Sequence, residues 1–105
     1  MILSSKDFNV FELQNAIGTK NILKANQIGN YFAANPKENS IIKTIAMLFG
    51  YFTKLMIYHQ LKDKSRNNVA SALSVSPFFV QSYQVAAKNY SLQKLISIIA
   101  LLKEY

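Results

Sequence analysis

The chain has 105 residues, enough for one domain with a modest hydrophobic core. It has no cysteine, which excludes disulfides and thiolate metal sites, and three glycines and two prolines are too few for a turn-rich β fold. Twelve Lys and Arg against five Asp and Glu give a net charge of +7, which bears on attraction to polyanions more than on fold. We predict one all-α domain, a compact bundle of five to six helices over residues 1–105. Residues 1–8 are expected to be partly disordered or a linker remnant.

The first helix is predicted from its ends. Asn9 is followed three residues later by Glu12, a spacing close to that of a capping box. A glycine is common where a helix ends, so this helix is expected to run from Val10 to Ile17 and to stop at Gly18.

Thr19 is expected to cap a second helix, Lys20 to Ala34, because the threonine precedes a stretch with helical periodicity. Pro36 disfavours helical geometry in the residue before it and ends this helix. The expected apolar stripe consists of Ile22, Ala25, Ile28, Gly29 and Phe32.

The longest helix is predicted at Ile41 to Leu61, capped by Ser40 or Asn39, as the centre of the domain. Gly50 lies inside it and costs about 1 kcal/mol relative to Ala, so a neighbouring backbone is expected to come close there. Much of this helix is expected to be buried, because its apolar positions are spaced four and three apart, like the seam of a helix packed lengthwise against another, and a second row broadens the seam. The seam positions are Ile41, Ile45, Leu48, Phe52, Leu55 and His59, and the second row is Ile42, Phe49 and Met56.

A membrane span is not expected in this helix. Lys43 and Lys54 interrupt its apolar window and leave ten uncharged residues between them, short of the roughly 20 needed to cross a bilayer. The segment "MILSSKDFNV" has no basic region of the kind that begins a secretory signal. We therefore expect no membrane partner and a cytoplasmic location.

The segment Asn67 to Lys88 has the spacing of a helix-turn-helix. A short helix, Asn68 to Leu73, is followed by a turn at Ser74 to Ser76 and by a second helix that opens on Pro77. This favours a small basic DNA-binding protein as an alternative function. The second helix nevertheless begins "SPFFVQSY" and has no positive charge before Lys88, although phosphate contacts dominate DNA affinity.

A compact helical corner is the favoured interpretation of this segment, because apolar side chains dominate it. The residues expected to pack there are Val69, Leu73, Val75, Val80 and Tyr83. A last helix, capped by Ser91, is expected to continue to the end at Tyr105. The lack of a stop signal suggests a piece of a longer protein. The side chains expected on one side of this helix are Leu92, Leu95, Ile96, Ile99 and Leu102.

No residue set for catalysis, for a metal or for a cofactor is present in the sequence. His59 is the only histidine, and we expect it to be partly buried and hydrogen-bonded. The five carboxylates fall at expected helix starts, loops or chain ends, and the isolated glycines form no phosphate loop. We expect no enzyme activity and no cofactor.

Two sets of candidate contact residues remain. Surplus aromatic and Met side chains suit an interface with another protein chain, and the candidates are Phe49, Tyr51, Met56, Tyr58, Phe78 and Phe79. Because Phe78 and Phe79 are adjacent, both cannot face one core, so at least one is expected to be available to a partner. The local basic cluster, a candidate for weak contact with polyanions, is Lys62, Lys64 and Arg66.

The order and spacing of three phrases, "FELQNAIG", "YFAANPK" and "PFFVQSYQVAAKNY", resemble a known family over Phe8 to Tyr105. It is the C-terminal helical domain of the δ subunit of the bacterial DNA polymerase III clamp loader, in particular its Bacteroidetes versions. The resemblance implies an all-helical third domain after two AAA+-type domains. It also implies a circular collar made from the third domains of five subunits.

The resemblance further implies the role of the domain. Its partners would be the γ/τ-like and δ′-like subunits of the clamp loader. The sliding clamp and DNA would be reached only through the rest of the full-length subunit or through the assembled complex. The parent would be an accessory subunit of the polymerase holoenzyme in the replisome of the bacterial cytoplasm, and the family supplies no catalytic residue.

Overall fold

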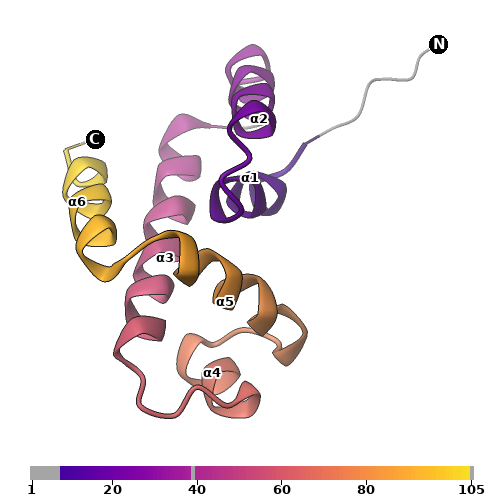
Figure 1. The fold of residues 1–105 in the computed structure, drawn as a ribbon. Coiled ribbons are helices and arrows are strands. Elements are labelled where there is room, and N and C mark those ends of the chain that lie inside the picture. Colours follow the sequence, from indigo (N-terminus) through magenta and orange to yellow (C-terminus); the bar gives the residue numbers. More distant parts are fainter. Residues whose placement is uncertain (1–7, 39, 105) are drawn as a thin grey trace.

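The computed structural model describes residues 8–38 and 40–104, in which all regular structure is helical, as predicted. The expected disorder of residues 1–7 lies outside the described residues, but the ring of Phe8 packs edge-on against that of Tyr31, with centroids 5.7 Å apart. In chain order (Figure 1) the elements are α1 (Val10–Gly18), α2 (Ile22–Ala34), α3 (Ile41–Gln60), α4 (Arg66–Leu73), the short 3₁₀ helix η2 (Pro77–Phe79), α5 (Val80–Asn89) and α6 (Leu92–Leu102).

Helix α3 is the axis of the domain. Helices α1, α4, α5 and α6 pack against it, whereas α2 packs against α1. In Figure 1, α6 runs back beside α3 in the opposite direction, and α5 crosses in front of the middle of α3. The prediction of a central long helix is therefore confirmed.

The hydrophobic core consists of three clusters along α3. The central cluster joins α3, α5 and α6, the second joins α1 and α2, and the third joins α4 to the start of α5. The third cluster confirms the predicted helical corner in the helix-turn-helix segment. Their buried members are Tyr51, Phe52, Leu55, Ala86, Ala87, Leu95 and Ile99; Leu13, Ala16, Ile28 and Phe32; and Val69, Ala70, Leu73 and Val80.

Several helix starts follow the sequence closely. The capping box of α1 is present, since Asn9 Oδ1 accepts from the backbone N–H of Glu12 at 2.9 Å and Glu12 Oε1 accepts from that of Asn9 at 3.3 Å. The hydroxyls of Ser40 and Ser91 cap α3 and α6, as predicted. Ser76 accepts from the N–H of Phe78 at 3.2 Å, but a 3₁₀ turn precedes α5 there.

The start of α2 differs from the prediction. Thr19 does not cap it; Asn21 does, and the helix begins at Ile22. Lys20 has a φ of 57°, and the N–H groups of Lys20 and Asn21 donate to the carbonyls of Ile17 and Ala16 at 3.0 and 2.8 Å. This is a Schellman ending of α1, so the residues expected to begin α2 are used to end α1.

Gly18 lies at the end of α1, as predicted, whereas Gly50 does not have the role expected of it. Gly18 ends α1 without a positive φ. A Cβ there would collide with the hydroxyl of Tyr51 and lie 3.0 Å from the Cβ of Ala86, so Gly18 permits close packing of α1 on α3 and α5. The predicted close approach at Gly50 is wrong, because nothing lies within 4 Å of a Cβ placed there.

Other corrections concern helix ends and faces. Helix α4 begins at Arg66 rather than Asn68, and α6 ends at Leu102 rather than continuing toward residue 105, which itself lies outside the described residues. The first turn of α3 projects beyond the core, so the seam side chains of Ile41 and Ile42 are exposed rather than buried. Ile96 of α6 is also mostly exposed.

By length and apolar composition alone, α3 could cross a membrane, and within the described residues it is the helix that passes this test. A core helix passes the same test. Tyr51, Phe52 and Leu55 of α3 are buried against α5 and α6, which accounts for the apolar composition of the middle of the helix.

Candidate interaction surface

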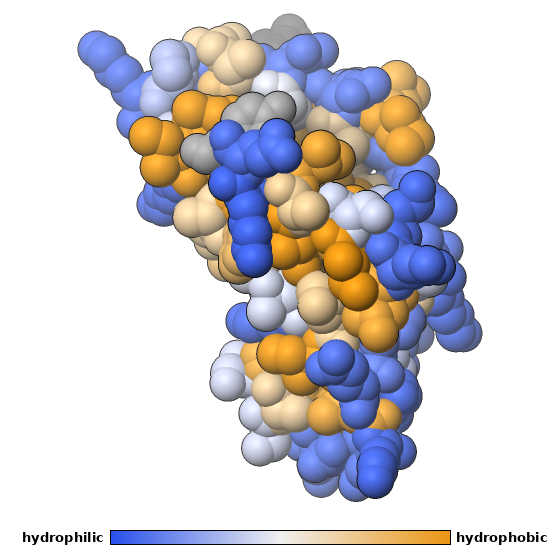
Figure 2. Space-filling view, turned by 90° about the vertical axis from the view of Figure 1, so that its left-hand side faces the viewer, coloured by the Kyte–Doolittle hydropathy of each residue, from blue (hydrophilic) through white to orange (hydrophobic). Residues whose placement is uncertain are grey.

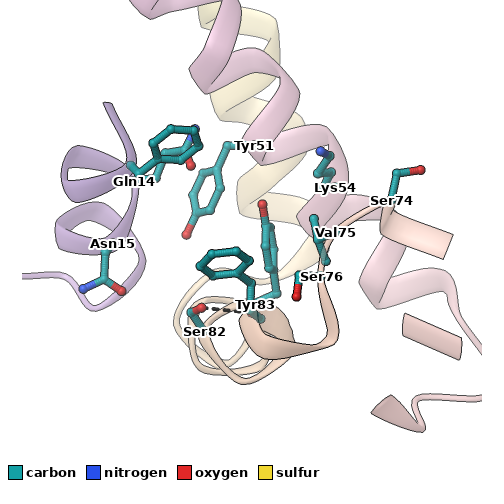
Figure 3. Close-up of a pocket in the computed structure, with 11 residues that line it drawn as sticks. Gln14, Asn15, Tyr51, Lys54, Ser74, Val75, Ser76, Ser82 and Tyr83 are labelled. Atoms are coloured by element: carbon teal, nitrogen blue, oxygen red, sulfur yellow. Dashed lines mark hydrogen bonds between the residues drawn. The ribbon is translucent and has the colours of Figure 1, made fainter. Parts of the chain in front are cut away.

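A groove of about 700 Å³ opens between α1, α3, the turn after α4, and the η2–α5 segment. In Figure 3, α1 lies on one side of it and the turn carrying Ser74 and Ser76 on the other, with the rings of Tyr51 and Tyr83 between them. The lining residues are Phe11, Gln14, Asn15, Tyr51, Lys54, Ser74, Val75, Ser76, Phe79, Ser82 and Tyr83.

The floor of the groove is aromatic. The rings of Tyr51 and Tyr83 are tilted against each other with centroids 5.5 Å apart. Burial raises the pKa of Tyr51 well above its ordinary value, and the neighbouring Tyr83 and Tyr90 add to the shift. Burial also raises the pKa of Tyr83. Both side chains are therefore neutral near pH 7, and the floor carries no charge.

The two walls carry exposed phenylalanines. Phe11 of α1 is 66% exposed and Phe79 of η2 is 52% exposed. Phe78 is still more exposed, at 78%, and its ring meets that of Phe79 edge-on at 5.4 Å, but it does not line the groove. Exposed aromatic side chains on a groove are typical of a binding surface rather than of a monomer's ordinary exterior.

Side-chain hydrogen bonds fix the α1 wall to the end of α5. Asn89 Nδ2 donates to the carbonyl of Gly18, and the hydroxyl of Tyr90 donates to the carbonyl of Ile17, each at 2.8 Å. His59 Nε2 donates in turn to the carbonyl of Tyr90 at 2.7 Å, which confirms the partly buried, hydrogen-bonded histidine. The first two bonds reach carbonyls at the end of α1, where that of Ile17 also accepts from the N–H of Lys20, and the three bonds hold α1, α3 and α5 together.

The six predicted contact residues do not lie together. Tyr51 is buried in the core, with its ring at the groove floor, and Phe49, Met56 and Tyr58 are half-buried against the central cluster. Phe78 and Phe79 are exposed. Whether any of the six meets a partner stays a prediction.

Phe11 and Val75 are groove residues that were missing from the predicted set. The sequence could have identified Phe11, because helical spacing places it on another face of α1 than the core positions Leu13 and Ala16. An aromatic side chain away from the core face is available for another contact. Val75 could not be found this way, since a turn residue has no helical periodicity.

The basic cluster is used within the fold. Lys64 Nζ donates to the carbonyl of Leu61 at 2.6 Å and lies 5.4 Å from the ring centre of Tyr58. Arg66 Nε donates to the carbonyl of Pro77 at 3.0 Å. Two of the three predicted polyanion contacts therefore have structural partners, and the exposed side chains at the start of the second helix are Phe78 and Phe79. This arrangement does not favour DNA reading.

A second apolar area lies on the side of the molecule formed by α6 and α3, where Figure 2 shows hydrophobic side chains among polar ones. Ile96 and Leu101 of α6 are 52% and 63% exposed. Within residues 8–38 and 40–104, no group of three or more His, Cys, Asp and Glu side chains could hold a metal ion.

The sequence was compared with known proteins. A search of curated proteins and a search of solved structures each found no match. The family model described as "DNA polymerase III delta subunit, C-terminal domain" matches residues 7–105. Because this match spans almost the whole sequence, the chain belongs to the family formed by the C-terminal domains of DNA polymerase III delta subunits.

Proposed function

We propose that this chain is an assembly domain that holds the δ subunit beside the other subunits of the clamp loader. The observation that carries the proposal is the family match over residues 7–105. The domain supplies apolar surface for such a role, since large hydrophobic side chains on α1, η2 and α6 are more than half exposed. Its neighbours would be γ/τ-like and δ′-like subunits in a collar.

The domain's part in clamp loading would be to position the δ subunit. A family of domains from a clamp-loader subunit is an accessory component rather than a catalytic one. By holding δ in place, the domain lets ATP binding in other subunits be coupled to opening of the sliding clamp by other parts of δ. The expected location is the bacterial cytoplasm, at the replisome.

A reconstitution experiment tests this proposal. The chain is mixed with purified γ/τ-like and δ′-like subunits of the same organism, and the mixture is followed by size-exclusion chromatography with light scattering. We expect the chain to enter a complex with them. Entry of full-length δ into the complex at normal affinity after deletion of this domain would contradict the proposal.

A further inference from the structure

We propose that the groove between α1, α3 and α5 receives an amphipathic helix with an acidic side chain, supplied by a neighbouring subunit. This inference rests on the proposed assembly function and identifies the contact within it. Three properties of the groove support it: its size and apolar lining, the backbone hydrogen bonds within its walls, and the charge of its lining residues.

The shape suits several apolar side chains entering together. Phe11 of α1 and Phe79 of η2 line the groove from different elements and are more than half exposed, and the floor is the Tyr51–Tyr83 ring pair. A space of about 700 Å³ lies within the range in which protein pockets bury most of a bound group. Exposed phenylalanines on two elements beside an aromatic floor match the row of apolar anchors on one face of a helix.

The walls determine the backbone conformation of the occupant. The helical walls, α1, α3 and α5, have backbone N–H and C=O groups that are largely bonded within the helices, and the remaining wall is the turn at residues 74–76. The described residues contain no strand edge, so an extended peptide could not add to a sheet here. An occupant that satisfies its own backbone hydrogen bonds, as a helix does, therefore suits these walls best.

The charge of the groove determines the polar character of the occupant. Lys54 is the cation among the eleven lining residues, and none of those eleven is a carboxylate. The nearby Glu12 accepts from the backbone of Asn9 in the α1 capping box. With a net charge of +7 on the whole chain, the groove attracts a helix with an Asp or Glu at its edge.

A nucleic-acid strand fits the groove less well. Stacking of bases on Phe11 and Phe79 would need several cations beside the rings to hold the phosphates. Lys54 is the one cation in the lining, and Lys64 and Arg66 bond to the carbonyls of Leu61 and Pro77. A partner helix with one carboxylate beside its apolar face complements the single positive charge of this apolar groove.

Matched variants separate the groove from the rest of the surface. Lys54→Glu changes the groove, and Lys94→Glu makes the same change in net charge on an exposed position of α6. Phe79→Ser removes an aromatic side chain from the groove, and Leu23→Ser removes an exposed apolar side chain of α2 that does not line the groove. Affinity for the purified partner subunits is measured by biolayer interferometry, and circular dichroism checks that each variant is folded.

We expect Lys54→Glu and Phe79→Ser to weaken binding by about tenfold or more, with Lys94→Glu and Leu23→Ser within about twofold of wild type. Photo-crosslinking from benzoylphenylalanine at position 79, in the complex made from purified subunits, then identifies the partner segment. That segment should be a helix with an Asp or Glu. Its change to Lys should restore affinity for the Lys54→Glu variant.

The outcomes distinguish this inference from the proposed function. If the wild-type chain binds no purified subunit, the assembly function itself fails. If the wild type binds and the groove variants bind equally well, or if the two control variants weaken binding as much, the groove is not the contact. A crosslinked segment without a carboxylate overturns the inference while the assembly function stands. The same holds if the groove variants bind single-stranded DNA less tightly than wild type but bind the subunits equally well.

Discussion

Gly18 and Gly50 are both helical glycines, but their surroundings are opposite. A Cβ on Gly18 would meet Tyr51 and Ala86, and a Cβ on Gly50 would meet nothing within 4 Å. At the scale of single residues, the stability of this domain thus depends on where α1 touches α3 and α5. The ring pair of Tyr51 and Tyr83 lies beside this contact.

Alanine substitutions at the two glycines should therefore change stability in opposite directions. Gly18→Ala should lower the free energy of unfolding by about 1–3 kcal/mol, because overpacking forces buried neighbours apart. Gly50→Ala should raise it by about 0.5–1 kcal/mol, because Ala restricts the unfolded chain and favours helix. Urea unfolding followed by circular dichroism measures both. A destabilised Gly50→Ala variant would show that the position is not open.

The buried tyrosines predict a loss of stability in alkali. The pKa of Tyr51 is raised above 10.0 by burial, so the folded state keeps the proton after the unfolded state has lost it. The stability is fully present below the unfolded pKa and is lost as the pH rises above about 10, by up to about 1.4 kcal/mol per pH unit. Urea unfolding between about pH 8 and about pH 11 tests this. The Tyr51→Phe variant should show a shallower decline, and an equal decline would contradict the assignment.

At the scale of elements, two helices end on a non-glycine residue in the left-handed region. Lys20 follows α1 and Ser74 follows α4, each with a φ of 57°. After α4, the N–H groups of Val75 and Ser74 donate to the carbonyls of Ala70 and Ser71 at 3.0 and 3.3 Å. These turns set the directions of the segments that follow, and the second one forms a wall of the groove.

Ser74→Gly should stabilise the domain by about 0.5–1 kcal/mol, because glycine has no Cβ to strain in the left-handed region. The control is Ser71→Gly, an exposed position inside α4, which should destabilise by about the same amount. The midpoint of thermal unfolding should therefore rise above that of wild type for Ser74→Gly and fall below it for Ser71→Gly. A Ser74→Gly variant no more stable than wild type would show that the strain is relieved elsewhere.

At the scale of the whole molecule, α3 joins three small cores rather than covering one large one. Its first turn is exposed, and α2 is held mainly through α1. The domain therefore leaves large hydrophobic side chains at the surface on several sides. An elongated arrangement of this kind offers separate faces to more than one neighbour, in agreement with a role in assembly.

The charge of +7 belongs to the whole surface rather than to a DNA-reading site. Duplex DNA titrated at about 50 and about 200 mM salt should bind weakly, without sequence preference, and binding should vanish at the higher concentration. Gln81→Ala, at the start of α5, should leave this binding unchanged. Tight binding with sequence preference that Gln81→Ala abolishes would instead support the helix-turn-helix interpretation.

Local sequence features determined most helix limits and the all-α class. Capping by Asn9, Ser40, Ser76 and Ser91 depends on contacts within one turn, so it can be predicted without knowledge of the fold. The family resemblance was also present in the order of the phrases, and the match over residues 7–105 confirms it.

Tertiary structure alone decided where the helices meet, and therefore where the groove lies. The close packing at Gly18 depends on Tyr51 and Ala86, which are distant in the sequence, and only the packed molecule shows that the position of Gly50 is open. The carbonyls of Ile17 and Gly18 are bonded by Tyr90 and Asn89, more than 70 positions away. Periodicity shows which side of a helix is apolar, but it does not show whether another helix covers that side. For this reason Ile41 was expected to be buried and is exposed, and only the packed molecule brings Phe11 and Phe79 to the same groove.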